Sequence, residues 1–191
     1  MLRIARITEL AHHLVGLVVE QGNVVIDATA GNGYDTLFLA EKVGPSGRVY
    51  SFDIQEEAID KTYKKLKQQN LGKQVILLNE SHEHLRHFVR DQVNVIMYNL
   101  GYLPGGDQSV TTKHDTTLES LKQALQLLAP GGLISIVMYP GHQEGAEEKK
   151  RIISFCKKLD SARYASLNTC LLNRGQNPPE LAVIQKKDLL N

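Results

Sequence analysis

Short, wholly apolar segments alternate with longer amphipathic segments along almost the whole chain. The apolar segments have the length and β-branched content of buried strands, and the others repeat apolar residues at the period of a helix. Strands that alternate with helices form a parallel sheet covered on both faces. The expected strands are 24–27, 48–53, 74–78, 93–98, 133–138, 165–171 and 181–185, and the expected helices are 3–20, 34–43, 56–69, 82–90, 115–128 and 145–159.

The last two expected strands have no long helix between them, which predicts an antiparallel hairpin at one edge of the sheet. We therefore expect an α/β fold with a Rossmann-like, doubly wound, seven-stranded sheet, mostly parallel with an antiparallel C-terminal strand. No internal repeat or Pro/Gly/Ser linker interrupts the chain, so residues 1–191 are expected to form one domain. Ligands of such sheets bind outside the carboxyl ends of the strands. These ends correspond here to segments 27–36, 53–55, 79–82, 99–107 and 139–142.

Composition narrows the class of protein. Lys and Arg total 22 against 21 Asp and Glu, which excludes a uniformly basic coat but allows a local basic patch for nucleic acid. The two cysteines cannot form a disulfide framework, and no apolar run reaches the roughly 20 residues that span a bilayer. The first residues lack the layout of a signal peptide. We expect a cytoplasmic protein without membrane contact and without a metal site.

The segment Val24–Thr36 is the most specific in the chain: an apolar strand ends in an acid, a Gly-x-Gly turn follows, and a helix opens. Gly31 and Gly33 permit backbone angles and close ligand approach that other residues do not. The start of the helix offers free N–H groups to an anionic group. Asp53 ends the next strand 20 residues after Gly33, the spacing at which an acid accepts hydrogen bonds from ribose hydroxyls. The sequence therefore predicts a cofactor that contains adenosine.

Two such cofactors fit this turn, NAD and S-adenosylmethionine. The dinucleotide fingerprint places a third glycine three residues after the second, but here Gly33 is followed by Tyr34, Asp35 and Thr36. Asp35 and Asp27 add negative charge that repels a pyrophosphate but attracts the ammonium and sulfonium of S-adenosylmethionine. The pattern favours S-adenosylmethionine over NAD. A third interpretation is that Gly31 and Gly33 only shape the turn and no cofactor binds there.

Four segments, Asp27–Thr36, Phe52–Gln55, Asn79–His82 and Asn99–Asp107, together resemble a bacterial family of S-adenosylmethionine-dependent class I methyltransferases. That family was formerly labelled "putative rRNA methylase" and is associated with the tRNA 5-aminomethyl-2-thiouridine methyltransferase of Gram-positive bacteria. The resemblance extends over residues 7–186. It implies N-methylation of the aminomethyl group of 5-aminomethyl-2-thiouridine at the wobble position, in the anticodon region of tRNA.

Four alternatives stay open beside this interpretation. The chain could methylate rRNA or a small-molecule amine, because a fold alone does not specify the acceptor. It could also be a binding module that senses S-adenosylmethionine without catalysis, or an oxidoreductase that uses a nicotinamide cofactor.

The resemblance also implies roles for individual residues at the cofactor. The turn around Asn32 and Asp35 holds the methionine part, Asp53 takes the ribose hydroxyls, and Ser81 and His82 flank the adenine. The expected cofactor contacts are Asp27, Thr29, Gly31, Asn32, Gly33, Asp35, Thr36, Asp53, Gln55, Ser81 and His82.

The Asn-Leu-Gly-Tyr segment that begins at Asn99 resembles the Asn-Pro-Pro-Tyr loop of amino-methyltransferases. This implies that Asn99 and the Leu100 carbonyl accept hydrogen bonds from the acceptor amine, while Tyr102 stacks on the base. His114 and His142 are candidate proton acceptors, although a surface or core position suits both equally well. The expected catalytic residues are Asn99, Tyr102 and His142. The structural alternatives are a turn at the strand end for Asn99 and packing within the loop for Tyr102.

The polar loop 98–112 is long for its place in the fold, and we expect it to be functional and to move when no RNA is bound. The segment Tyr139–His142 follows the fifth strand at the same sheet edge and is expected to complete the acceptor pocket. Arg174 is expected to reach a phosphate and Asn177 a base. The expected substrate contacts are Leu100, Gly101, Pro104, Tyr139, Arg174 and Asn177.

Two charged helical faces are interpreted as solvated. One contains the lysines of segment 61–67, and the other is the mixed segment 147–151. A homodimer could use the apolar stripe of the first helix or the C-terminal hairpin.

Overall fold

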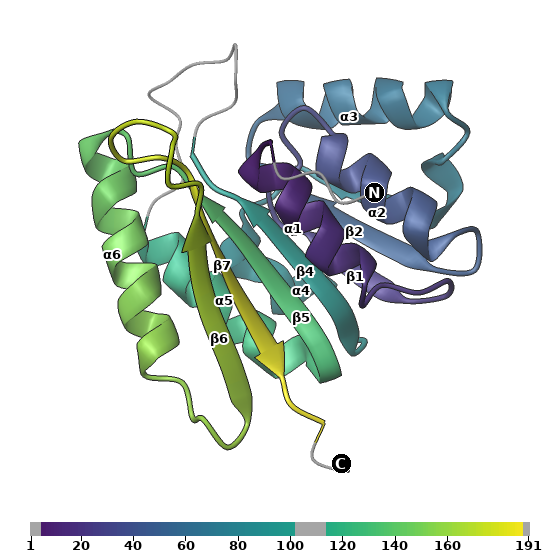
Figure 1. Cartoon of the computed structure of the whole chain (residues 1–191). Helices are drawn as coiled ribbons and strands as arrows, with labels where there is room; N and C mark the ends of the chain where they lie inside the picture. Colours follow the sequence, from purple (N-terminus) through teal and green to yellow (C-terminus); the bar gives the residue numbers. More distant parts are fainter. Residues whose placement is uncertain (1–4, 102–113, 189–191) are drawn as a thin grey trace.

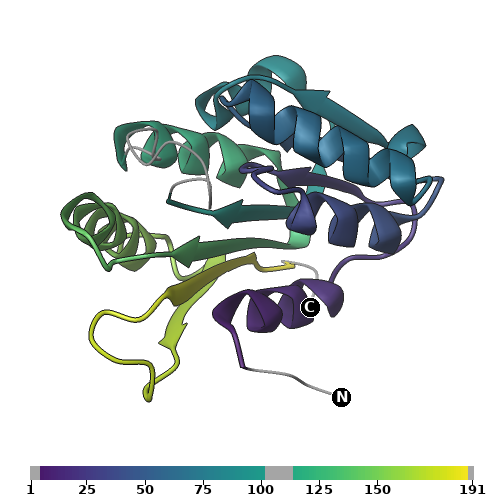
Figure 2. The same ribbon diagram turned by 90° about the horizontal axis from the view of Figure 1, so that it is seen from above.

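The computed structural model describes residues 5–101 and 114–188, which form one sheet with helices on both of its faces (Figure 1; Figure 2 shows the same layers from above). The strands are β1 (Val24–Asp27), β2 (Arg48–Phe52), β3 (Val75–Leu78), β4 (Val93–Asn99), β5 (Leu128–Met138), β6 (Tyr164–Cys170) and β7 (Glu180–Lys186). The helices are α1 (Ile7–Gly16), α2 (Tyr34–Val43), α3 (Glu56–Gln68), α4 (Leu85–Phe88), α5 (His114–Leu127) and α6 (Gln143–Lys157), with the 3-10 turns η1 (Gly72–Gln74) and η2 (His82–His84).

The strand order is β3-β2-β1-β4-β5-β7-β6. The first five of these strands pair in parallel, whereas β7 runs antiparallel between β5 and β6. The expected fold class is confirmed, with β6 as the outer strand of the C-terminal hairpin. The strand order reverses at β1, so the place for a ligand lies at the carboxyl ends of β1 and β4.

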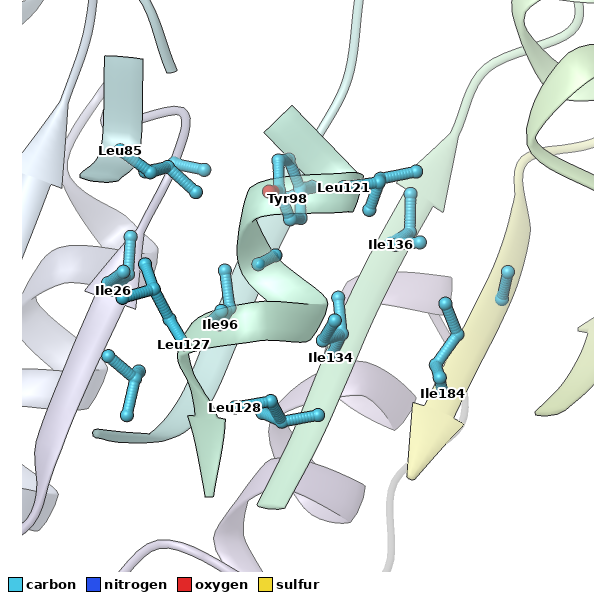
Figure 3. Packing of buried hydrophobic residues seen from close by; sticks show 14 of the residues in the cluster. Ile26, Leu85, Ile96, Tyr98, Leu121, Leu127, Leu128, Ile134, Ile136 and Ile184 are labelled. Carbon is cyan, nitrogen blue, oxygen red and sulfur yellow. The ribbon is translucent and has the colours of Figure 1, made fainter. Parts of the chain in front are cut away.

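Alternate residues of each strand point to opposite faces of the sheet. Val25 and Val95 pack with α1, α2 and α3, whereas Ile26 and Ile96 pack with α4, α5 and α6. Figure 3 shows the second of these clusters, in which the buried Tyr98 lies beside α5 and its hydroxyl is 2.7 Å from a serine hydroxyl of that helix. Burial on both faces explains why the strands are apolar throughout rather than alternately polar.

Most elements agree with the expected bounds to within one or two residues, but two of the expected helices differ more. The first helix stops at Gly16 rather than near residue 20, because Leu17 and Val18 make 3-10-type bonds to the carbonyls of Leu14 and Val15. The segment expected as one helix over 82–90 is split into η2 and the short α4.

The fifth strand begins earlier than the sequence predicts. Leu128 already pairs with Val93, and Leu133 pairs with Val95, so residues 129–132 form a bulge between the two. At Gly132 a Cβ atom would lie 2.9 Å from two backbone oxygens, so the bulge requires glycine there. The Ala-Pro-Gly-Gly segment 129–132, which lies between the expected helix and the expected strand, therefore forms a bulge inside β5.

Within residues 5–101 and 114–188, no helix combines the length and the apolar character that a membrane span requires.

Candidate functional site

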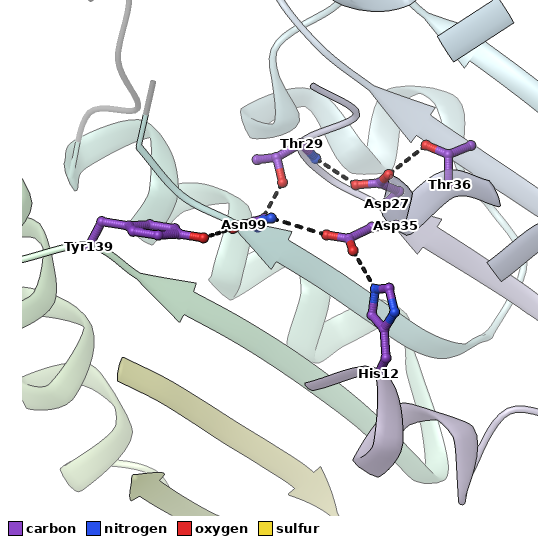
Figure 4. A network of polar contacts seen from close by, with 7 residues as sticks. All are labelled: His12, Asp27, Thr29, Asp35, Thr36, Asn99 and Tyr139. Atoms are coloured by element: carbon purple, nitrogen blue, oxygen red, sulfur yellow. Dashed lines mark hydrogen bonds and ion pairs between the residues drawn. The ribbon is translucent and has the colours of Figure 1, made fainter. Parts of the chain in front are cut away.

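Four polar side chains from different elements meet near the carboxyl ends of β1 and β4 (Figure 4). The Tyr139 hydroxyl, just after β5, donates a hydrogen bond to Asn99 Oδ1 at 2.9 Å. Asn99 Nδ2 lies 3.4 Å from Asp35 Oδ2, and His12 Nε2 of α1 bonds to Asp35 Oδ1 at 2.5 Å. The side-chain amide of Asn99 is therefore held from both sides, by a phenol and by a carboxylate.

The turn between β1 and α2 is shaped by its glycines. Gly33 caps α2 with φ of 80°, in the left-handed region that favours glycine. A Cβ atom on Gly33 would lie 2.8 Å from Thr62 Oγ1 and 3.0 Å from its Cα, so the turn packs directly against α3. Lys65 of α3 adds a 2.6 Å bond to the Asn32 carbonyl. The structure therefore brings this part of the expected cofactor site together.

Asp53 connects the end of β2 to the same turn. Its Oδ2 accepts a hydrogen bond from Gly31 N at 2.8 Å, and its Oδ1 accepts one from Gln55 N at 2.9 Å. Burial raises the pKa of this carboxyl, and these backbone bonds offset part of that effect. A carboxylate offers about four lone-pair sites, so Asp53 keeps capacity for two ribose hydroxyls.

Asp27 corrects one step of the sequence-based argument. Its side chain is fully buried, with Oδ1 bonded to Thr29 N and Oδ2 to the Thr36 hydroxyl. Burial, and then the charge of Asp35, raises the pKa of Asp27 to about 7. Asp27 and Thr36 therefore brace the turn from below, and at neutral pH Asp27 contributes much less negative charge than a free carboxylate.

Thr29 links the two strands at the centre of the site. Its hydroxyl accepts a 2.7 Å hydrogen bond from the backbone N–H of Asn99, while its own N–H is bonded to Asp27. The end of β4 is thereby fixed to the end of β1.

His82 and Ser81 have structural partners of their own. The His82 ring is buried, donates from Nδ1 to the Ala28 carbonyl at 3.2 Å and packs edge-on against Tyr98. Burial lowers the pKa of His82, so the ring is neutral at pH 7. Ser81 caps η2 by accepting a bond from Glu83 N. Both lie beside the β1 end, where the expected adenine contacts belong.

The segment after β4 is only partly described. Leu100 is buried, and its N–H bonds to the Val137 carbonyl. Gly101 has φ of 122°, and a Cβ atom on it would be 3.6 Å from the Tyr139 ring. The expected contacts Tyr102 and Pro104, and most of loop 98–112, lie outside the described residues, as does the side chain of His114.

His142 has a different role from the expected one. It is the N-cap of α6, and its Nδ1 accepts a 3.1 Å hydrogen bond from Gly145 N. Because Nδ1 accepts this bond, a neutral ring carries its proton on Nε2, so neither nitrogen offers a free lone pair to a substrate and the expected role of proton acceptor is revised.

Tyr139 and Arg174 line one cavity of about 380 Å³. The cavity lies between the start of α1 and the β6–β7 connection, and Arg174 also bonds to the Ala5 carbonyl at 2.7 Å. Asn177 lies elsewhere, in a second cavity against α6. The cavity beside Tyr139 is lined in part by Arg6, Ile7, Tyr139, Arg174, Pro178 and Pro179.

Sequence reasoning missed His12 and Ile54. His12 stacks on Phe38 with ring centroids 4.1 Å apart and reaches Asp35 from α1, and no local sequence signal indicates that pairing. Ile54 follows Asp53 and keeps 57% of its surface exposed. The available signal was that Ile54, an apolar residue, directly follows the acid at the end of β2. Such a residue can offer a flat surface to an adenine ring.

The buried Asp27 predicts a pH effect on stability. Its folded-state pKa of about 7 exceeds the ordinary value of 3.8, so the folded protein binds more protons than the unfolded chain between these values. The free energy of unfolding therefore falls as pH rises through this window. Asp27→Asn should reduce this fall in urea denaturation measured from pH 4.5 to 7.5. Asp60→Asn on the exposed side of α3 is the matched control, and an equal fall in both variants would contradict the assignment.

Comparison with known proteins agrees with this geometry. The model of the family described as "Putative rRNA methylase" matches residues 49–185, and a model of protein-L-isoaspartate O-methyltransferase matches residues 3–85. A relative from Arabidopsis thaliana, "tRNA (mnm(5)s(2)U34)-methyltransferase, chloroplastic", is 41% identical over 181 residues. That alignment covers 90% of this chain, and the chain spans 66% of the relative's length.

Two solved structures resemble the whole chain. A "putative rRNA-methylase" from Clostridium thermocellum is 40% identical with a TM-score of 0.94, covering 97% of this chain and 100% of that one. A "putative methyltransferase" from Streptococcus mutans, in complex with SAH, is 37% identical with a TM-score of 0.87, covering 96% and 99%. The expected family is confirmed: this chain belongs to the rRNA methylase family of methyltransferase-like proteins.

Proposed function

We propose that this protein uses S-adenosylmethionine to methylate the aminomethyl nitrogen of 5-aminomethyl-2-thiouridine at the wobble position of tRNA. The observation that carries the proposal is the Asn99 amide, held between Tyr139 and Asp35 at the end of β4. A fixed amide oxygen at this place can orient an amine for attack. The substrate follows the name of the Arabidopsis relative, of which this chain spans 66%.

The crevice fits S-adenosylmethionine. The turn at Gly33 packs directly against α3 and leads into the start of α2, where a helix has backbone N–H groups without intrahelical partners. Asp53 has lone pairs left for the ribose, and Ile54 offers an apolar surface to the adenine. Asp35, at the start of α2 and close to Asn99, supplies the negative charge that suits an ammonium and a sulfonium.

S-adenosylmethionine, when bound, supplies a methyl group activated by its sulfonium. The chain's own residues then have to orient the amine. Asn99 Oδ1 has a second lone pair beside the one that Tyr139 occupies, and the Leu100 carbonyl follows it in the chain. Both can accept N–H bonds from the amine and direct its lone pair toward the cofactor. Burial and the charge of Asp35 raise the pKa of Tyr139, so its phenol stays protonated and keeps donating to Asn99.

The cavity beside Tyr139 favours a nucleotide as the acceptor. Two arginines, Arg6 and Arg174, line it together with Tyr139 and two prolines. Guanidinium groups match phosphate oxygens, and flat apolar surfaces accept a base. A free small amine would use neither feature.

Nucleoside analysis tests the substrate. tRNA from a strain that lacks the protein should accumulate 5-aminomethyl-2-thiouridine, and the purified protein with S-adenosylmethionine should methylate it, both followed by mass spectrometry. Ribosomal subunits serve as the parallel substrate, because the family description points to rRNA. Methylation of the subunits with unchanged tRNA nucleosides would refute the proposed substrate.

Asp53→Ala should weaken S-adenosylmethionine binding by about 10- to 100-fold, because charge-assisted hydrogen bonds are worth about 1.5–3 kcal/mol. Calorimetric titration measures the change. Asp60→Ala, an exposed acid on α3, is the control and should leave the affinity within twofold. An unchanged affinity in Asp53→Ala would remove Asp53 from the cofactor site.

Asn99→Ala should lower kcat for tRNA by about 100-fold, as expected when the reacting amine loses its orientation. The affinity for S-adenosylmethionine should change much less. Tyr139→Phe keeps the ring and removes only the bond to Asn99, so it should cause a smaller loss of kcat. Equal losses of turnover and cofactor affinity in Asn99→Ala would mean that Asn99 merely holds the turn together.

A further inference from the structure

A second cavity, of about 470 Å³, lies between α6 and the β6–β7 connection. Its lining includes Pro140, Lys149, Lys150, Ser154, Lys157 and Asn177, and none of the described residues that line it carries a carboxylate. We name this cavity the α6 groove. We propose that the α6 groove binds the phosphate backbone of the RNA substrate outside the methylation site, an inference that rests on the proposed function.

The fold separates the charges of α6, which the sequence shows only as a mixed segment. Glu148 is buried and accepts a 2.7 Å bond from the Thr117 hydroxyl, so it points toward α5. Glu147 accepts a 2.9 Å bond from Arg151 Nε. Lys149, Lys150 and Lys157 line the groove, so this part of the mixed, solvated face is basic.

The groove lysines differ in their surroundings. Lys149 bonds to Glu180 at 2.6 Å, which fixes its position and offsets its charge. Lys150 has 80% of its side chain exposed, and its ion pair with Glu147 at 3.9 Å is of the weak surface kind. Lys157 is also exposed and lies two helical turns further along, about 10 Å at the usual helical rise. Two cations at this spacing suit a run of phosphates better than a single anion.

Two pairs of neighbouring residues place the α6 groove next to the cavity that Tyr139 lines. Tyr139 lines the cavity beside Asn99, and its neighbour Pro140 lines the α6 groove. Likewise Pro178 lines the first cavity and Asn177 the second. An RNA strand that leaves the reacting base can therefore cross the β6–β7 connection and reach α6, where Ser154 and Asn177 add polar groups for sugar and phosphate contacts. The net charge of only +1 makes such a local patch the means of attraction.

The test removes the two exposed cations with Lys150→Gln/Lys157→Gln and compares them with Lys64→Gln/Lys67→Gln. The control lysines are exposed on α3, which lies toward the opposite end of the sheet (Figure 1). Binding of tRNA from the deletion strain is measured over a series of KCl concentrations, together with kcat and KM for methylation. The affinity for S-adenosylmethionine shows that each variant is folded.

The groove variant should bind tRNA about tenfold more weakly at low salt, with a salt slope smaller by about 1.4–1.8, the value for two lost phosphate contacts. KM for tRNA should rise, kcat should stay within twofold, and the control should match the wild type. An unchanged slope, or equal losses in both variants, would overturn the proposal, as would a wild type that does not bind tRNA. A wild type that binds tRNA through the groove without methylating it would instead refute the proposed function alone.

Discussion

The geometry of the site depends on how the turn after β1 is held. Gly31 N bonds to Asp53 at the end of β2, and Gly33 lies against Thr62 of α3 with no space for a side chain. The turn is thus fixed to the neighbouring strand and to the helix that follows it. Because these supports come from regular elements, they hold the turn in one shape.

Three acids surround this turn, and their environments give them different roles. Asp27 is buried below it and titrates near neutrality, Asp53 is partly buried at the ribose side, and Asp35 pairs with His12. The sequence-based preference for a cationic cofactor counted Asp27 and Asp35 alike. The electrostatic preference therefore depends on Asp35 and Asp53, whereas Asp27 is buried and braces the turn.

The sequence predicted local elements well and distant pairings poorly. β1 and α2 have the expected bounds, because a strand–glycine–helix motif fixes each boundary by a residue type. His12 was missed because its partner Asp35 is 23 residues away and the pairing depends on how α1 packs. His142 was predicted to be catalytic because its position at the carboxyl edge of the sheet could be read from the sequence. Its bond from Gly145 N–H, which makes it the N-cap of α6, could not. The bulge in β5 was hidden because Pro and Gly signal turns and bulges alike.

The place of the C-terminal hairpin explains how basic side chains gather at one edge of a nearly neutral chain. Since β7 lies between β5 and β6, the connection before it emerges at the same sheet edge as Asn99 and Tyr139. It separates a cavity with two arginines from a groove with three lysines. The antiparallel end of the sheet thus gathers basic residues from the N-cap of α1, from α6 and from the hairpin, whereas Asp35 and Asp53 follow β1 and β2 on the parallel side.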